Sequence, residues 1–230
     1  TSILNQDGIT VIEGRGAADN LSTTGSNTVN TPVVFYGDLA TLALDSVQSR
    51  LIAISANEPT AGGNDVIVTS AEMSVVVGGL GSDSITTLGE PSLGGLNQTI
   101  SDIVLGDHGD LTFEVDGSVT AIASSYSGIG GSDTIDTQIG LDIVLGGTAD
   151  DVITTGTDES GDLARDIVLG DEGTATFDSQ GRIDTIESTN TGIGGSDQIT
   201  TGGGPDIVLA GADQDTVLTE SGDDIVLGDS

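Results

Sequence analysis

Carboxylates recur along the C-terminal part of the chain at a fixed spacing of nine residues. The clearest run comprises Asp197, Asp206, Asp215 and Asp224. An aliphatic residue follows each of them by two positions, namely Ile199, Val208, Val217 and Val226. Acids on so strict a spacing become neighbours if the chain folds into stacked repeats, and carboxylate oxygens are ligands that hard cations such as Ca²⁺ prefer. The spacing therefore predicts cation binding.

The overall charge points to the same chemistry. The 230 residues include 37 acids and 4 bases, which gives a formal net charge of −33. Nucleic acid and anionic membrane surfaces are poor partners for such a chain. A disordered acidic tail would be poor in aliphatic residues, whereas here Ile and Val recur among the acids. We therefore expect the carboxylates to be neutralised by cations before the chain can compact.

Other features of the composition limit the fold. With two Tyr, three Phe and no Trp, we expect a thin core of Ile, Val and Leu rather than a broad multilayer domain. No Cys is present, so disulfides and thiolate metal sites are excluded. No apolar run reaches the length of a membrane span. The chain opens with Thr1 and shows no signal peptide, so it is expected to be a processed product or an excised slice of a longer array.

The short repeat has a recognisable consensus. Residues 78–86 (GGLGSDSIT) fit G-G-x-G-x-D-x-U-x, in which U is a large apolar residue. Looser copies occupy 14–22, 128–136, 146–154 and 192–200. A longer period of 64 residues is superimposed, because GGSDTIDT at 130–137 returns as GGSDQITT at 194–201. Fixed periods of this kind are typical of solenoids.

The elements that must position the acids follow from the repeat. Each nine-residue unit divides into a Gly-rich turn and a short strand, since Gly accepts the positive φ of tight turns and D-x-U-x points one apolar residue inward. Two units make one 18-residue turn, so the predicted fold is all-β, a right-handed parallel β-roll (a β-solenoid). We expect insertions of 22 residues, which follow DIVLGD, to form β-hairpins that project from the roll. Residues 108–122 show the hairpin pattern, with Asp116-Gly117 at the turn.

In this arrangement the acids divide between two edges. One edge carries Asp65, Asp83, Asp133, Asp151, Asp197 and Asp215. The other carries Asp102, Asp142, Asp166, Asp206 and Asp224, with Ser74 where an acid is missing. Stacked carboxylates ~4.8 Å apart repel by about 1 kcal/mol per pair in water, and a cation between the turns would remove that repulsion.

The unit GGLGSDSIT and its neighbours resemble the calcium-binding nonapeptide of RTX (repeat-in-toxin, haemolysin-type) proteins, and the similarity covers most of residues 62–230. The resemblance implies that several Ca²⁺ ions lie between successive turns. It implies that the ligand pairs are Asp65/Asp83, Asp133/Asp151, Asp197/Asp215, Asp206/Asp224 and Asp142/Asp166. It implies further ligands in the backbone oxygens of Gly78, Gly81, Gly146, Gly192 and Gly204. The hairpin-bearing unit resembles arrays in long bacterial surface and secreted proteins, which implies export in an unfolded state and folding outside the cell.

Two regions are expected along the chain. Residues 1–61 form a diverged N-terminal partial repeat with a hairpin, and residues 62–230 form a continuous calcium-binding roll built on units 102–165 and 166–229. For the stacked acids, the alternative is a turn-capping role without metal. Asp38, Asp107, Asp171 and Asp229 are expected to be turn residues rather than additional ligands. His108 is expected at the surface, while Phe113 and Tyr126 are expected to pack a hairpin against the roll.

We expect a structural function, in which calcium rigidifies an extracellular or cell-surface segment that serves as a spacer or adhesin scaffold. One alternative is a recognition module for glycan, for neighbouring copies or for ice, the last suggested by ITT at 85–87, 153–155 and 199–201. A second is an accessory roll of a secreted enzyme that lies outside this chain. With one His, four bases and no Cys, the chain itself is not expected to be an enzyme.

Overall fold

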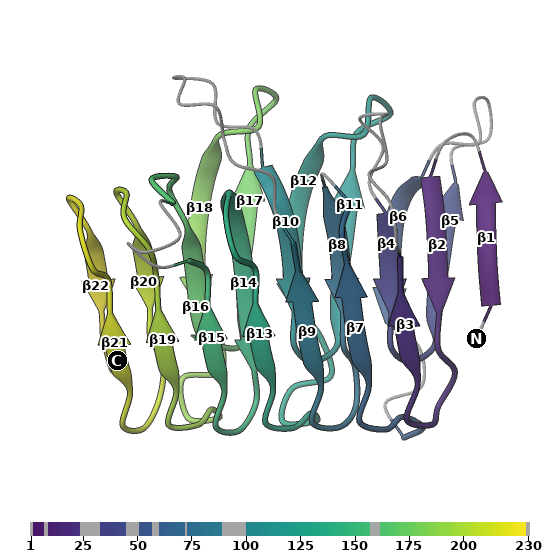
Figure 1. Cartoon of the computed structure of the whole chain (residues 1–230), viewed down its shortest axis with the longest axis horizontal. Helices are drawn as coiled ribbons and strands as arrows, with labels where there is room; N and C mark the ends of the chain where they lie inside the picture. The colour runs from purple at the N-terminus through teal and green to yellow at the C-terminus, as the bar shows by residue number, and fades with distance from the viewer. Residues whose placement is uncertain are drawn as a thin grey trace.

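The computed structural model describes residues 2–6, 9–23, 33–44, 51–56, 60–71, 73–88, 100–156 and 162–228. These residues contain strands and turns but no helix, so the described chain offers no helical membrane span. The strands follow one another along the long axis in sequence order, from β1 at one end to β22 at the other (Figure 1). The prediction of an all-β fold is confirmed.

Sheet A is the longest sheet and is parallel apart from its first pair of strands, β1 and β2. Its order is β1 (Ser2–Gln6), β2 (Ile9–Glu13), β4 (Val33–Tyr36), β8 (Ser74–Val77), β10 (Ile100–Leu105), β14 (Leu141–Gly147), β16 (Ile167–Asp171), β20 (Ile207–Leu209) and β22 (Ile225–Leu227).

Sheet B is parallel throughout and alternates with sheet A along the chain. Its order is β21 (Thr216–Leu218), β19 (Gln198–Thr200), β15 (Val152–Thr154), β13 (Thr134–Asp136), β9 (Ser84–Thr87), β7 (Val66–Thr69) and β3 (Asn20–Ser22). Residues 18 apart stack as predicted, for example Ile135 on Ile153. The register also survives insertions, because Ile85 stacks on Ile135. The strands on both sides of residue 61 share these sheets.

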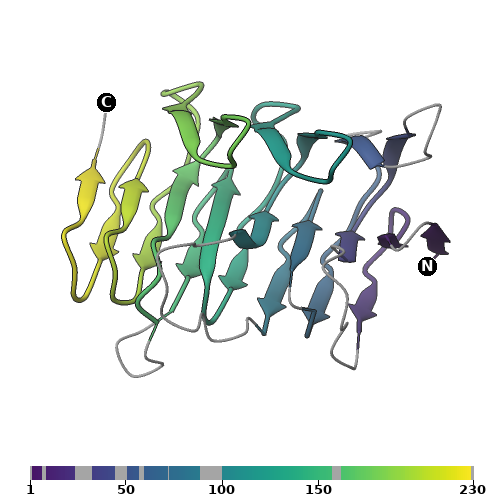
Figure 2. The ribbon, with the colours of Figure 1, turned by 90° about the horizontal axis from the view of Figure 1, so that it is seen from above.

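The three predicted hairpins are present, but they do not project. They are β5 (Ala40–Leu44) with β6 (Leu51–Ala56), β11 (Gly109–Phe113) with β12 (Val119–Ser124), and β17 (Gly173–Phe177) with β18 (Ile183–Ser188). Neighbouring hairpins pair with one another, β6 with β11 and β12 with β17, and so build an antiparallel sheet C. Figure 2 shows the hairpins lying along one side of the two parallel sheets.

Sheet A lies between sheets B and C, and its central strands are buried on both faces. Val104 belongs to the apolar cluster shared with Ile85 and Ile135 of sheet B. Its neighbours Ile103 and Leu105 belong to the cluster that contains Ile122 and Phe113 of sheet C. Consecutive apolar residues in D-I-V-L are thus explained, because a strand covered on both faces is apolar at adjacent positions.

Two expectations from the sequence are therefore wrong. The molecule has three layers rather than a thin two-sheet core, and the hairpins cover sheet A rather than extend into solvent. The physical reason is that the residues which the hairpins turn inward, such as Leu111 and Ile122, are apolar and fully buried. Burying such faces against sheet A stabilises the fold more than exposing both would.

Candidate functional site

One row of acids runs along the edge where strands of sheet A end and strands of sheet B begin. We call it the glycine edge, for a reason given below, and it comprises Asp19, Asp65, Asp83, Asp133, Asp151, Asp197 and Asp215. The backbone N–H of each acid donates to Oδ1 of the next, at 2.6 to 3.0 Å. The structure therefore brings together every acid that the sequence assigned to this edge, and adds Asp19.

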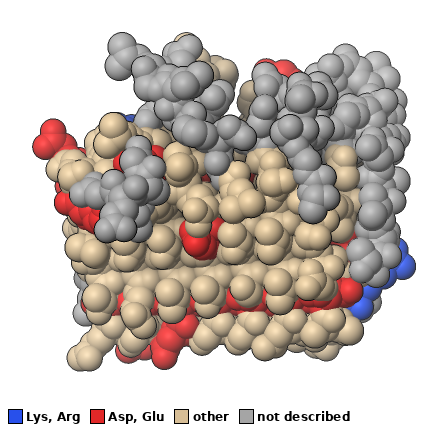
Figure 3. Space-filling view, in the orientation of Figure 1, with Lys and Arg blue, Asp and Glu red and all other residues tan. Residues whose placement is uncertain are grey.

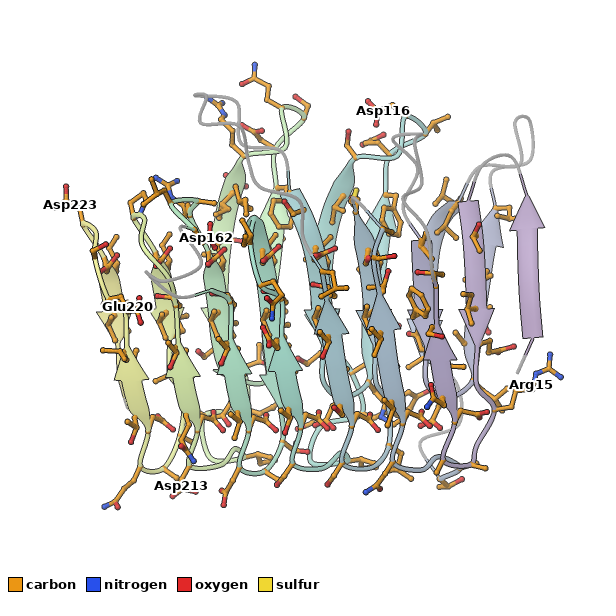
Figure 4. The ribbon with its side chains drawn as sticks, in the orientation of Figure 1. Arg15, Asp116, Asp162, Asp213, Glu220 and Asp223 are labelled. Carbon is orange, nitrogen blue, oxygen red and sulfur yellow. The ribbon has the colours of Figure 1, made fainter. Side chains whose placement is uncertain are left out.

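A second row follows the opposite edge, where strands of sheet B end and strands of sheet A begin. We call it the threonine edge, and it comprises Ser74, Asp102, Asp142, Asp166, Asp206 and Asp224. Here too each backbone N–H donates to Oδ1 of the next acid, at 2.7 to 3.1 Å. Ser74 occupies the first position, as predicted. Asp213, labelled in Figure 4, lies in a turn of the glycine edge, and Asp223 lies in a turn of the threonine edge.

The two edges differ in the residue that faces each acid. On the glycine edge it is Gly five residues before the acid, as in Gly78–Asp83 and Gly146–Asp151, or Gly just before a hairpin, as in Gly106; at Asp215 the position is held by Ala210. A Cβ on Gly106 would lie less than 3.0 Å from both Asp133 Oδ2 and the Gly146 carbonyl oxygen, a separation that real Cβ atoms do not show. Each of these aspartates therefore fits only against bare backbone.

On the threonine edge the same position carries Thr. Thr137 precedes Asp142 by five residues and Thr201 precedes Asp206 by five, and both threonines are fully buried. At the equivalent position Thr155 Oγ1 donates to Asp166 Oδ2 at 2.7 Å. Thr87 lies in the same row, and its hydroxyl donates to the Thr137 carbonyl oxygen at 3.3 Å. These threonines were missed, although the T-x4-D spacing could have indicated them.

Five of the second carboxylate oxygens on the glycine edge have no hydrogen-bond donor. Oδ2 of Asp65, Asp83, Asp133, Asp151 and Asp197 is buried without a hydrogen-bond partner. These side chains are at most 2 % exposed. The carbonyl oxygens of the glycine row, such as Gly146 O beside Asp133 Oδ2, lie close to them. A buried region that contains only acceptors is unfavourable unless a cation or a proton enters it.

Burial and mutual repulsion raise the pKa values of these carboxyl groups. Burial, followed by repulsion from Asp107, raises the pKa of Asp133 to about 10. Burial raises the pKa of Asp151 to about 9 and that of Asp83 to about 8, again with repulsion from neighbouring acids. The pKa of Asp197 rises to about 7 and that of Asp65 to about 6, mainly through burial. The ionised form of this row therefore needs a positive partner.

Burial also raises the pKa values on the threonine edge, but hydroxyl groups oppose it. The pKa values of Asp142 and Asp166 lie well above the ordinary value because of burial, while the hydroxyl groups of Thr137 and Thr155 act to lower them. Burial raises the pKa of Asp206, and the Thr201 hydroxyl lowers it. The pKa of Asp102 rises to about 6 through burial, against the hydroxyls of Thr87 and Ser74.

The acids that begin the hairpins fill neighbouring turns. Asp107 Oδ1 accepts from Gly131 N at 2.9 Å, while Oδ2 accepts from Thr148 N at 2.5 Å and from Thr148 Oγ1 at 2.7 Å. Asp171 accepts in the same way from Gly195 N, at 2.9 Å, and from Ala212 N. Asp38 accepts from Leu80 N at 2.6 Å. These contacts agree with the predicted turn role, and Asp229 lies outside the described residues.

Three residues lie in surroundings that the sequence did not predict. Gly192 is exposed, with open space around its Cα, and the position predicted for it is taken by Gly170 beside Asp197. The reason is that the hairpin enters directly after the first Gly of the repeat. His108 is 1 % exposed rather than at the surface. Tyr126 is 40 % exposed and touches His108 edge-on, while its hydroxyl donates to the Ala56 carbonyl oxygen at 3.3 Å.

The remaining predicted glycines lie in turns. The carbonyl oxygens of Gly78, Gly81, Gly146 and Gly204 face the next turn, each close to a glycine of that turn. Among the described residues no three carboxylate or imidazole side chains converge on one point. A cation here would therefore be held by aspartate together with backbone oxygens. In Figure 3 acidic atoms form a line along the lower part of the molecule, the side on which Asp213 is labelled in Figure 4.

Comparisons with models of known protein families, with curated proteins and with solved structures give no match. The geometry of the two edges is therefore the basis for inferring function.

Proposed function

We propose that the chain is a calcium-binding structural segment of an extracellular or cell-surface protein, and that Ca²⁺ makes it rigid. The observation that carries the proposal is the glycine edge, where buried carboxylate oxygens without donors lie against backbone carbonyl oxygens. Oxygen ligands of this kind suit Ca²⁺. The resident ion would supply the positive charge that lets the row ionise.

The residues that would hold calcium on the glycine edge include three of the predicted pairs. Asp65 with Asp83, Asp133 with Asp151, and Asp197 with Asp215 are joined by amide-to-carboxylate hydrogen bonds and so lie in successive repeats. The backbone carbonyl oxygens of the glycine row would supply further calcium ligands. The alternation between sheets A and B supports our interpretation of these sheets as a right-handed β-roll, with each ion binding between successive turns.

The extracellular setting follows from the same balance of charges. Without cations a chain of net charge −33 repels itself, which favours an open state during export. Calcium outside the cell would then drive folding, because binding to the folded state alone stabilises it by mass action. A segment that folds in this way suits a spacer or scaffold whose partners are calcium and neighbouring repeats.

Far-UV circular dichroism during a Ca²⁺ titration tests the proposal, with Mg²⁺ as the control ion. We expect a cooperative gain of β-structure at Ca²⁺ concentrations of about 10⁻⁴–10⁻³ M, which is typical of extracellular modules. Mg²⁺ should act weakly, because it demands octahedral geometry and loses its water reluctantly. Full β-structure in a cation-free sample at neutral pH, unchanged by Ca²⁺, would rule the proposal out.

Recognition by the outer face of sheet C is a second candidate, favoured by one observation. A row of small uncharged residues crosses all six of its strands in register: Ala43, Ala53, Thr112, Ala121, Thr176 and Thr185. The row itself carries no charge, so two copies could meet along it. Sedimentation velocity of Thr112→Lys against the unaltered chain tests self-association. The ice-binding version loses support, since Thr87, Thr155 and Thr201 of the ITT segments are fully buried.

A further inference from the structure

The two edges share one backbone arrangement but offer different groups to the second carboxylate oxygen. On the glycine edge, the groups near Asp133 Oδ2 are a glycine and a carbonyl oxygen, so no side chain donates to it. On the threonine edge, buried threonines occupy that place, and Thr155 Oγ1 donates a 2.7 Å hydrogen bond to Asp166 Oδ2. Oδ2 of Asp102, Asp142 and Asp206 is buried without a hydrogen-bond partner, as on the glycine edge, but these oxygens belong to a row that carries hydroxyl groups.

The same pairing extends along the threonine edge. Thr137 and Thr201 hold the position of Thr155 in their own repeats, five residues before Asp142 and Asp206. Their hydroxyl oxygens and Oδ2 of the two aspartates are buried, and none of these four atoms has a hydrogen-bond partner within normal distance. Each hydroxyl can therefore turn its proton toward the carboxylate opposite without breaking another hydrogen bond.

Ser74 provides an independent observation. It occupies a position of the threonine edge without a charge, and its N–H still donates to Asp102 Oδ1 at 2.7 Å. Its own hydroxyl lies 3.1 Å from Thr69 Oγ1, the threonine five residues before it. The row therefore continues through a neutral residue that gives a cation nothing to neutralise. The glycine edge keeps an aspartate at each described position from Asp19 to Asp215.

We propose that the threonine edge holds no metal, and that its threonine hydroxyls perform there the role that calcium performs on the glycine edge. This inference rests on the proposed function, since it assigns all of the ladder calcium to the glycine edge. The inference reduces the set of predicted calcium ligands, because Asp142, Asp166, Asp206 and Asp224 would then hold the repeats together without binding calcium. The threonine five residues before the acid decides whether a repeat binds calcium.

The test counts bound calcium per chain in two matched double variants of the full chain. Asp133→Asn with Asp151→Asn alters the glycine edge, and Asp142→Asn with Asp206→Asn alters the threonine edge. Asparagine keeps the oxygen that accepts the ladder hydrogen bond and removes the charge, so both variants should fold. Bound Ca²⁺ is measured by equilibrium dialysis and elemental analysis at saturating Ca²⁺, with circular dichroism as a check of folding.

We expect the glycine-edge variant to lose about one Ca²⁺ or more per chain, and the threonine-edge variant to keep the full number. Loss of calcium from both variants would overturn the inference while the proposed function stands. An unaltered chain that binds no calcium would overturn both. Should the threonine-edge pair fail to fold, Asp142→Ser supplies the same test, because it copies the natural Thr69–Ser74 pair. Loss of calcium from folded Asp142→Ser would count against the inference.

Discussion

The backbone amide of Asp133 donates a hydrogen bond of 2.7 Å to Oδ1 of Asp151, which follows it by 18 residues. The same bond recurs at every described step of both edges, so one oxygen of each carboxylate is committed to holding the next repeat. The other oxygen is left for a different partner. A nine-residue spacing of acids thus has two consequences, alignment of the strands and a row of buried charges.

Without calcium, stability should fall as pH rises. Folded-state pKa values of about 8, 10 and 9 for Asp83, Asp133 and Asp151 lie above those of the unfolded chain, so the folded chain holds these protons more tightly. Stability is then greatest below about pH 4 for these groups and is lost as pH rises through their folded pKa values. His108, whose pKa is lowered by burial, acts in the opposite sense but is a single group.

Thermal melts of cation-free protein at pH 5 and pH 8 measure this effect. We expect a cooperative melt at pH 5 and a lower midpoint, or no folded baseline, at pH 8, with a much smaller difference at saturating Ca²⁺, where the ion replaces the protons. A cation-free melting midpoint that rises from pH 5 to pH 8 would show that the pKa values of these carboxyl groups are not raised in the folded chain.

Gly106→Ala should destabilise the fold and weaken calcium binding. The added methyl group would lie within 3.0 Å of Asp133 Oδ2 and of the Gly146 carbonyl oxygen, so backbone must shift. Overpacking of this kind costs about 1–3 kcal/mol. Gly192→Ala is the matched control, because open space surrounds it, and its effect should stay within about 0.5 kcal/mol. Chemical unfolding compares the two, and equal effects would mean that the glycine row is misplaced.

Asp107→Ala should lower the free energy of unfolding by about 2–4 kcal/mol, because it removes the acceptor of Gly131 N, Thr148 N and Thr148 Oγ1. Asp184→Ala, at an exposed position of β18, removes the same charge as a control and should change little. Urea unfolding at saturating Ca²⁺ measures both. If Asp107→Ala also removes calcium, Asp107 is a ligand rather than a turn residue.

Ile122→Ala tests the third layer. Ile122 is fully buried between sheet C and sheet A, so its truncation should cost about 2–5 kcal/mol. Leu163→Ala is the control, since Leu163 is 74 % exposed. A hairpin that projected into solvent would make the two substitutions alike in denaturant unfolding.

Much of this structure could be predicted from the sequence, because stacking depends on local spacing. The pairing of Ile135 with Ile153, the two rows of acids and the turn at Asp116-Gly117 all follow from periods and turn residues. The packing of sheet C could not be predicted from spacing, since it depends on which face of sheet A remains uncovered. The burial of His108 was not predicted from the sequence either.

The contrast between the edges was available in the sequence but was obscured by the insertions. G-x4-D is visible at Gly78–Asp83, whereas at Gly106 and Gly170 a hairpin separates the glycine from its acid. The glycine nearest in sequence to Asp197 that fits the repeat is Gly192, and it was therefore predicted in place of Gly170. T-x4-D is equally regular at Thr137–Asp142 and Thr201–Asp206. Threonine is common in strands, however, so its presence at this spacing does not by itself indicate a contact with a carboxylate.

The most direct test is anomalous scattering from crystals grown in Ca²⁺. We expect a row of anomalous peaks beside Oδ2 of Asp83, Asp133, Asp151 and Asp197, and none beside Asp142 or Asp166. Calcium-saturated crystals with no peak along the glycine edge would rule out calcium binding there, because the buried oxygens of that row would then be neutralised by protons alone.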